Sequence, residues 1–198
     1  MGRADAILEV HPLLLQLKYM VTGRLLRSRR LPIPSFRKHK LTKSAQISPF
    51  RFDDYNFSAG KAYDQWSGYG QSKTANILFT KYLASHLASK GVLSFSLHPG
   101  VIMETTLGNH VPQEDFAQLT GTTKRNTGKD FQMDFPVKSR QEGCATTLVA
   151  ALDPRLQGES GAFLTDCQVK QLEPECENAD DAEELWKISG ELVGERFE

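Results

Sequence analysis

The chain has 198 residues, which is enough for one domain with a substantial hydrophobic core. Lys and Arg number 24, and Asp and Glu also number 24, so the formal net charge is zero. This balance excludes a global electrostatic attraction to nucleic acid or to an anionic membrane as the basis of function. Three cysteines without a Cys-x-x-Cys pair cannot all be bridged, so we expect reduced thiols and a cytoplasmic protein. The five histidines show no ligand spacing, and we expect no metal site.

Residues 1–43 form an atypical basic segment without a family match of its own. Nine residues between Lys18 and Lys43 are Lys or Arg and none is acidic, while Pro32 and Pro34 exclude a regular helix there. This segment could bind an acidic partner, but a solvated basic face is the simpler interpretation. The apolar stretch at residues 11–26 is interrupted by polar and basic residues. It is too broken to span a bilayer, which takes about 20 apolar residues, so we expect no transmembrane segment.

The next stretch, up to about residue 61, is predicted to be mostly loop. Residues 41–50 could include the end of a strand that runs into this loop. Asp53 and Asp54 are adjacent, as metal ligands can be. With no other ligands clustered around them, we interpret them as turn formers.

A helix is predicted from about Trp66 to Ser89, because apolar residues recur there at three- and four-residue steps. Near its start, Tyr69 and Lys73 stand four residues apart, which places both side chains on one helix face. A free tyrosine has a pKa of about 10, and a cation a few ångströms away can lower it by about 1–3 pKa units. The pair can therefore serve as a general acid–base, although Tyr-x-x-x-Lys by itself is more often a plain surface pair.

A short buried strand is predicted at Val92–Leu97, after Gly91 has ended the helix. The strand stops at residues 98–100, His-Pro-Gly, since proline cannot continue a strand ladder and glycine permits a tight turn. Ligands of α/β sheets bind beyond the carboxyl ends of the strands. Residues 99–102 are therefore a candidate binding site.

The remaining chain is predicted to hold a long loop, two helices and one strand. Residues 103–137 show little periodicity, which predicts a loop that forms a mobile lid over the site, and their apolar side chains suggest a bulky apolar substrate. A helix is predicted at residues 139–152, a final short strand at residues 161–166 and an amphipathic helix at residues 180–193.

Taken together, several stretches resemble the catalytic half of the short-chain dehydrogenase/reductase family. They are Arg51–Phe57, Tyr69–Phe79, His98–Ile102, Gly161–Cys167 and Leu185–Ser189. The sequences of these stretches are similar to those of the retinol-dehydrogenase and WW-domain-oxidoreductase branch in its fungal form. The resemblance covers residues 44–198. It implies an α/β fold with a partial Rossmann-type, doubly wound parallel sheet that lacks the N-terminal dinucleotide-binding strands.

The resemblance also implies catalytic roles. Tyr69 would give a proton to the substrate oxygen or take one from it, and Lys73 would bind the nicotinamide ribose and lower the pKa of Tyr69. The family's catalytic serine corresponds to the stretch that contains Ser44, with the hydroxyl of Thr42 as an alternative.

For the cofactor, NADP or NAD, the resemblance implies a second set of contacts. Pro99, Gly100 and Ile102 would line the nicotinamide, together with the Tyr–Lys pair. Thr105 would contact the amide or the phosphates, although Glu104 stands at the usual spacing. No metal belongs to this site.

The sequence departs from the family's pattern in its cofactor-binding motifs, and this leaves two interpretations open. The chain contains no Gly-x-x-x-Gly-x-Gly turn and no Asn-Asn-Ala-Gly motif. The first interpretation is an NAD(P)-dependent oxidoreductase that transfers a hydride between nicotinamide and a small lipophilic alcohol or carbonyl. It would have no nucleic-acid partner, and it could form a homo-oligomer. The second is a truncated, catalytically inactive remnant that cannot bind the cofactor by itself.

Overall fold

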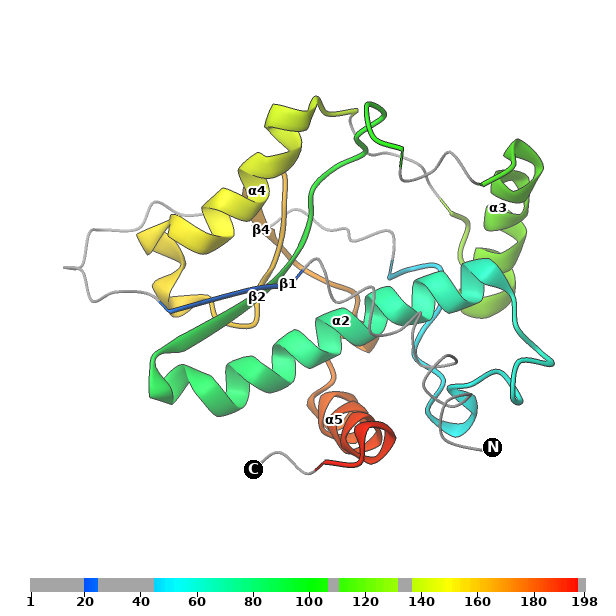
Figure 1. Cartoon of the computed structure of the whole chain (residues 1–198), viewed down its shortest axis with the longest axis horizontal. Coiled ribbons are helices and arrows are strands. Elements are labelled where there is room, and N and C mark those ends of the chain that lie inside the picture. Colours follow the sequence, from blue (N-terminus) through cyan, green and yellow to red (C-terminus); the bar gives the residue numbers. More distant parts are fainter. Residues whose placement is uncertain (1–19, 25–44, 107–110, 132–136, 196–198) are drawn as a thin grey trace.

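The computed structural model describes residues 20–24 (backbone only), 45–106, 111–131 and 137–195, and a four-stranded sheet lies among its helices (Figure 1). In chain order, the strands and α-helices are β1 (Met20–Arg24), α2 (Gln65–Leu87), β2 (Val92–His98), α3 (Gln113–Thr127), α4 (Arg140–Leu152), β3 (Phe163–Thr165), β4 (Gln168–Lys170) and α5 (Ala179–Val193). Short 3₁₀ turns lie at Phe52–Asp54, Ala88–Lys90, Pro154–Gly158 and Pro174–Cys176.

The sheet is mixed, with strand order β1-β2-β3-β4. Among the described strands, only β2 and β3 pair in parallel, and β1 and β4 are antiparallel to their neighbours. The α/β class is confirmed, but the expectation of a parallel sheet is wrong for the described strands. At the β3–β4 end the reason is local. Asp166 and Cys167 both have positive φ, 52° and 59°, and close a two-residue hairpin turn that reverses the chain.

Helix α2 and strand β2 confirm the central predicted unit. The Asp64 side chain caps the helix by accepting the N–H of Trp66 at 3.0 Å, which satisfies one of the open donors of the first turn. Gly91, with φ +78°, ends the helical stretch and turns the chain into β2. Five consecutive buried residues then make up most of β2, as expected for a strand covered on both faces.

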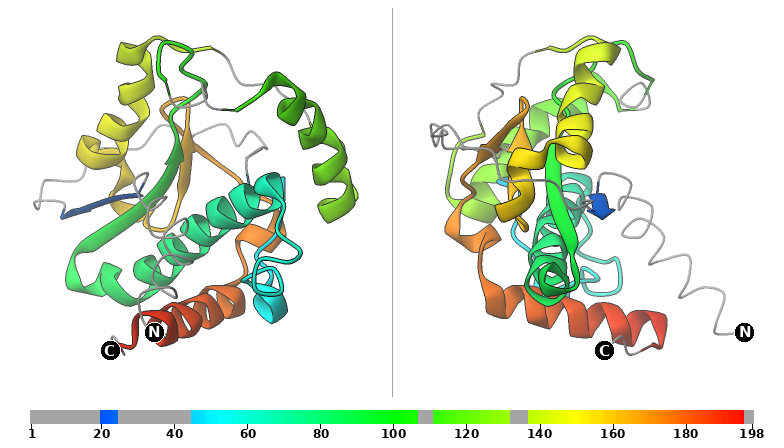
Figure 2. Two further views of the ribbon diagram at one scale, coloured as in Figure 1. Left: turned by 45° about the vertical axis from the view of Figure 1, so that its right-hand side comes forward. Right: turned by 90° about the vertical axis from the view of Figure 1, so that its left-hand side faces the viewer.

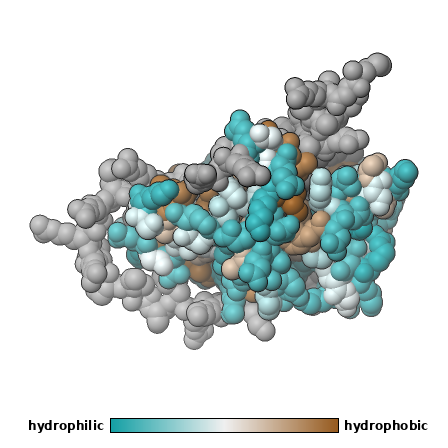
Figure 3. Space-filling model, turned by 90° about the horizontal axis from the view of Figure 1, so that it is seen from below, coloured by the Kyte–Doolittle hydropathy of each residue, from teal (hydrophilic) through white to brown (hydrophobic). Residues whose placement is uncertain are grey.

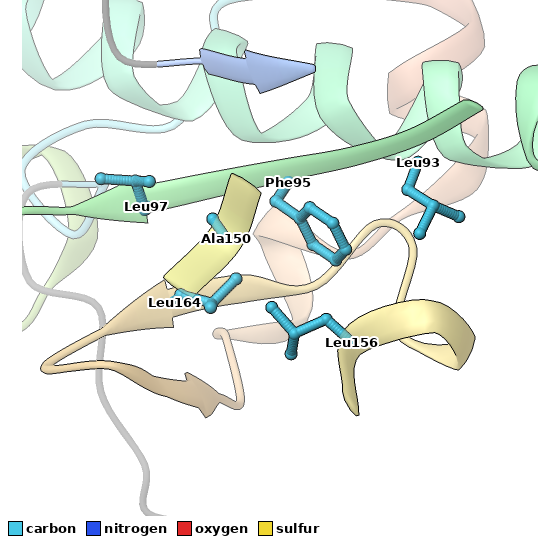
Figure 4. Packing of buried hydrophobic residues seen from close by; sticks show 6 residues of the cluster. All are labelled: Leu93, Phe95, Leu97, Ala150, Leu156 and Leu164. Atoms are coloured by element: carbon cyan, nitrogen blue, oxygen red, sulfur yellow. The ribbon is translucent and has the colours of Figure 1, made fainter. Parts of the chain in front are cut away.

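The core lies on both faces of the sheet. On one face, residues of β2 and β3 pack against α4 and the turn after it (Figure 4); the cluster is Leu93, Phe95, Leu97, Ala150, Leu156 and Leu164. On the other face, Phe163 of β3 meets Ile77 of α2. A third cluster joins α2 to α5 through Leu78 and Leu185. The order of layers is therefore α4, sheet, α2 and α5 (Figure 2).

Helices α4 and α5 confirm two further predictions. Ser139 starts α4 with a reciprocal capping box to Glu142, and the helix ends at the Asp153-Pro154 pair. Helix α5 begins after its cap Asn178 and buries Ala182 and Leu185. The face of the molecule seen in Figure 3 is mostly hydrophilic, and hydrophobic residues show only in small areas of the described surface.

Two loop assignments need correction. Residues 103–137 are not one long loop, because the 15-residue helix α3 occupies their middle. This helix buries one apolar side chain, Leu119, and two threonines, so its sequence shows almost no apolar period. Of the stretch at 41–50, residues 45–50 form turn and loop rather than strand, and residues 41–44 lie outside the described residues.

Candidate active site

Tyr69 and Lys73 lie one turn apart near the start of α2. The Nζ atom of Lys73 is 5.1 Å from the centroid of the Tyr69 ring, so the predicted placement on one face is confirmed. Both residues are partly buried. Burial lowers the pKa of the Lys73 ammonium, because a low-dielectric surrounding disfavours the charged form.

The opposite side of α2 is clamped by the chain that precedes it. Gly70 permits close approach there, since a Cβ at this position would lie 2.6 Å from the backbone nitrogen of Ser48. Thr74 Oγ1 donates to the carbonyl of Ser48 at 2.9 Å, and Gln71 Nε2 donates to the carbonyl of Tyr55 at 2.8 Å. These contacts fix the rotation of the helix about its axis, and with it the direction of the Tyr–Lys face.

Strand β2 brings the Pro99–Gly100 turn to the same end of the molecule. His98, the last residue of the strand, accepts the N–H of Gly100 on Nδ1 at 3.0 Å. Burial, assisted by the positive charge of Lys73, lowers the pKa of His98 from 6.5 to about 4. His98 is therefore neutral at pH 7, and its proton lies on Nε2 because Nδ1 is the acceptor. The first residue before the turn therefore lies within electrostatic range of the Lys73 ammonium.

The residues after the turn are only partly shielded from solvent. Ile102 packs on α4, where a Cβ on Gly143 would lie 2.2 Å from its Cδ1 atom. Thr105 is exposed and its hydroxyl donates to the carbonyl of Ile102 at 3.0 Å. Glu104 is exposed and its carbonyl accepts a hydrogen bond from Arg140 at 2.7 Å. Gly100 is thus bonded to His98, whose pKa is lowered by burial and by the charge of Lys73, whereas Ile102, Thr105 and Glu104 contact neighbouring protein groups.

The predicted hydroxyl donors Ser44 and Thr42 lie outside the described residues. The residue that follows them, Ala45, is buried, and its carbonyl accepts from Thr74 on α2 at 3.3 Å. Ala45 thus lies against the helix that carries Lys73.

Helix α3 docks on the first turn of α2 through polar contacts that sequence reasoning missed. Asp64 accepts from Ser67 at 2.7 Å and also binds Thr122 and Arg125 of α3. Burial by itself would raise the pKa of Asp64, but the hydrogen bonds from the Ser67 side chain and from the backbone of Trp66 and Ser67, together with the charge of Arg125, lower it on balance. An aspartate just before a predicted helix is the N-cap signal that could have identified it.

Trp66 links helix α3 to the candidate acid–base. Its indole N–H donates to the carbonyl of Asp115 at 2.7 Å, and its ring lies 5.4 Å from the ring of Phe116. The edge of the same ring meets Tyr69 at 6.1 Å. Helix α3 is thereby positioned over the end of α2 where Tyr69 lies.

The described cysteines and acids do not form another chemical centre. All three cysteines are free, and burial raises the pKa of Cys176 to about 12, so its thiol stays protonated and inert. Within the part of the chain that the structure describes, no group of three or more His, Cys, Asp or Glu residues could hold a metal ion. No described helix is long and apolar enough to cross a membrane.

A helix with Tyr-x-x-x-Lys on one face, beside a strand that ends in a Pro-Gly turn, is the arrangement expected for a short-chain dehydrogenase/reductase. The chain belongs to this family. Its curated relatives include retinol dehydrogenase 12 of Homo sapiens, which is 30% identical over 181 residues, 91% of this chain and 52% of the relative. Retinol dehydrogenase 14 of Homo sapiens is 31% identical over 176 residues, 89% of this chain and 49% of the relative. The WW domain-containing oxidoreductase of Pongo abelii is 31% identical over 159 residues, 74% of this chain and 35% of the relative.

The chain spans about half the length of the retinol dehydrogenases that it matches. No family model and no solved structure matches it. The family assignment therefore depends on these relatives.

Proposed function

We propose that this chain carries the proton-transfer site of an NAD(P)-dependent oxidoreductase that acts on a lipophilic alcohol or carbonyl. The supporting observation is the position of the Lys73 ammonium, 5.1 Å from the Tyr69 ring, at the end of the molecule where β2 turns at Pro99–Gly100. A phenol beside a cation is a suitable general acid–base near neutral pH.

The donor set at this end fits the nicotinamide riboside part of such a cofactor. Lys73 offers an ammonium with three N–H donors for ribose hydroxyls, and the turn at Pro99 and Gly100 offers backbone contact to the nicotinamide. Ile102 and Thr105 would complete this contact. When bound, the nicotinamide accepts a hydride from an alcohol carbon or gives one to a carbonyl carbon.

The protein's own part in the reaction is the movement of one proton. During alcohol oxidation, Tyr69 takes the hydroxyl proton while the C–H bond electrons leave as the hydride. During carbonyl reduction, the phenol gives that proton to the developing alkoxide. Lys73 stabilises the phenolate in both directions. Ser44, which directly precedes the buried Ala45, is the proposed hydroxyl that orients the substrate oxygen, with Thr42 as its alternative.

An apolar substrate is favoured by the surroundings of Tyr69. The Trp66 ring meets the Tyr69 ring in a T-shaped arrangement and the Phe116 ring at a tilt, and Phe116 is 44% exposed. Such rings contribute apolar contact area without adding charge. Several of the relatives are named retinol dehydrogenases, which is consistent with a lipophilic alcohol.

The test is reductase activity of the purified chain with millimolar NADPH or NADH and a panel of aldehydes. Retinal and long-chain aldehydes should be reduced faster than short sugars. The matched control is Tyr69→Phe, which keeps the ring and removes the hydroxyl, and its turnover should fall by at least about 100-fold. Equal turnover by the wild type and Tyr69→Phe would rule out the proposed role.

A further inference from the structure

The Pro99–Gly100 turn is held by a side chain that the proposed reaction has not used. The His98 ring accepts the N–H of the residue two positions ahead, Gly100, at 3.0 Å. Asparagine and aspartate side chains commonly close turns with this same i to i+2 pattern. Gly100 has φ +93°, a conformation that residues with side chains rarely adopt, so this bond holds an unusual backbone in place.

A second set of contacts closes the other side of the turn. The aliphatic stem of Lys138 covers Gly100, since a Cβ there would lie 2.5 Å from Lys138 Cγ. The backbone N–H of Lys138 donates to the carbonyl of Val101 at 2.8 Å, and its Nζ atom binds Asp166 at 2.6 Å. His98 holds the turn from the side of β2, and burial together with the charge of Lys73 lowers its pKa.

Because Lys73 is positively charged, the residue that holds the turn must meet two chemical conditions. It must accept a hydrogen bond from Gly100, and it must carry no positive charge, because a second cation would repel the Lys73 ammonium. A partly buried neutral imidazole meets both conditions.

We propose that His98 is a positioning residue of the reaction, which fixes the Pro99–Gly100 turn against Lys73 through its bond to the Gly100 N–H. This inference depends on the proposed function, because the turn is the surface against which the nicotinamide would lie. Loss of the bond would let the turn relax by a fraction of an ångström to an ångström. Misplacement of this size costs up to about 100-fold in rate when two reactants must be aligned.

The first arm of the test measures the hydrogen bond directly and needs no turnover. Amide hydrogen exchange of Gly100 is followed by NMR in the wild type, in His98→Asn and in His98→Phe. Asparagine keeps an acceptor for the i+2 amide, whereas phenylalanine keeps a ring without one. Exchange should be at least about 10-fold faster in His98→Phe and within about 3-fold of the wild type in His98→Asn. The amide of Phe95, in the middle of β2, serves as the control for an intact strand.

The second arm measures kcat and KM for the cofactor. His98→Phe should lower kcat/KM by about 10- to 100-fold, and His98→Asn should restore most of the loss. Unchanged Gly100 exchange in His98→Phe, or faster exchange with unchanged kcat/KM, would overturn the proposal. An inactive wild type would refute the proposed function and with it the catalytic part of this inference. The exchange arm would still decide whether His98 holds the turn.

Discussion

Acidification should destabilise the fold through His98. Its pKa falls from the ordinary 6.5 to about 4 on folding, because burial and then the Lys73 charge oppose protonation. Between these two values the unfolded chain binds more protons than the folded chain, so stability rises with pH in this window and is lost as the pH falls. At pH 5 the linkage relation gives a loss of about 2 kcal/mol relative to pH 7, which grows to about 3 kcal/mol by pH 3.

Urea unfolding at pH 7 and pH 5 measures this loss when the wild type is compared with His98→Asn. Carboxylates such as Asp64, whose pKa is lowered in the fold, also contribute less to the free energy of unfolding in acid. This loss is the same in both proteins. The wild type should therefore lose about 2 kcal/mol more than the variant between the two pH values, with similar m-values. Equal losses would show that folding does not depress the His98 pKa, and the argument for a neutral acceptor would fail.

Three further outcomes are expected. Asp64→Ala removes the cap of α2 and its tie to α3, and should lower the free energy of unfolding by about 1–3 kcal/mol, whereas the exposed Asp53→Ala should change it by less than about 0.5 kcal/mol in the same urea assay. Gly100→Ala should lower the free energy of unfolding by about 1–3 kcal/mol, because Gly100 has φ +93° and is covered by the Lys138 stem. Gly121→Ala, in open space on α3, should raise it by about 0.5–1 kcal/mol, and thermal unfolding measures both changes. The 198-residue chain should bind NADPH weakly in calorimetry, because it contains no Gly-rich pyrophosphate turn, and saturable binding at micromolar concentrations would contradict this.

The elements that could be predicted from sequence are those with strong local signals. Helix α2 has an apolar period and ends near Gly91, and β2 follows as a continuous apolar run that stops at proline. Tyr69 and Lys73 could be placed on one face because helix geometry alone determines it.

The elements that were missed depend on contacts between distant parts of the chain. Helix α3 buries threonines and is tied to Asp64 across 58 residues and to Trp66 across 49 residues, so its own sequence carries little pattern. Strand β4 follows a two-residue Asp-Cys turn, which lacks the glycine that usually marks such hairpins. The proposed role of His98 depends on Lys73, twenty-five residues away in sequence, and the effect of Lys73 on the His98 pKa arises only in the fold.

The proposed proton-transfer part of the site is compact in sequence. The cap at Asp64, the Tyr–Lys face, β2 and the turn at Gly100 all lie within one helix–strand unit. Their geometry follows from helix periodicity, one cap and one turn, and contacts with residues 45–55 hold the helix in its rotation. Affinity for the rest of a dinucleotide has a different physical source, namely the backbone N–H groups of a Gly-rich turn. Alignment of the Tyr–Lys pair and cofactor affinity are therefore separable, so weak NADPH binding by this chain would leave the assignment of Tyr69 as the acid–base intact.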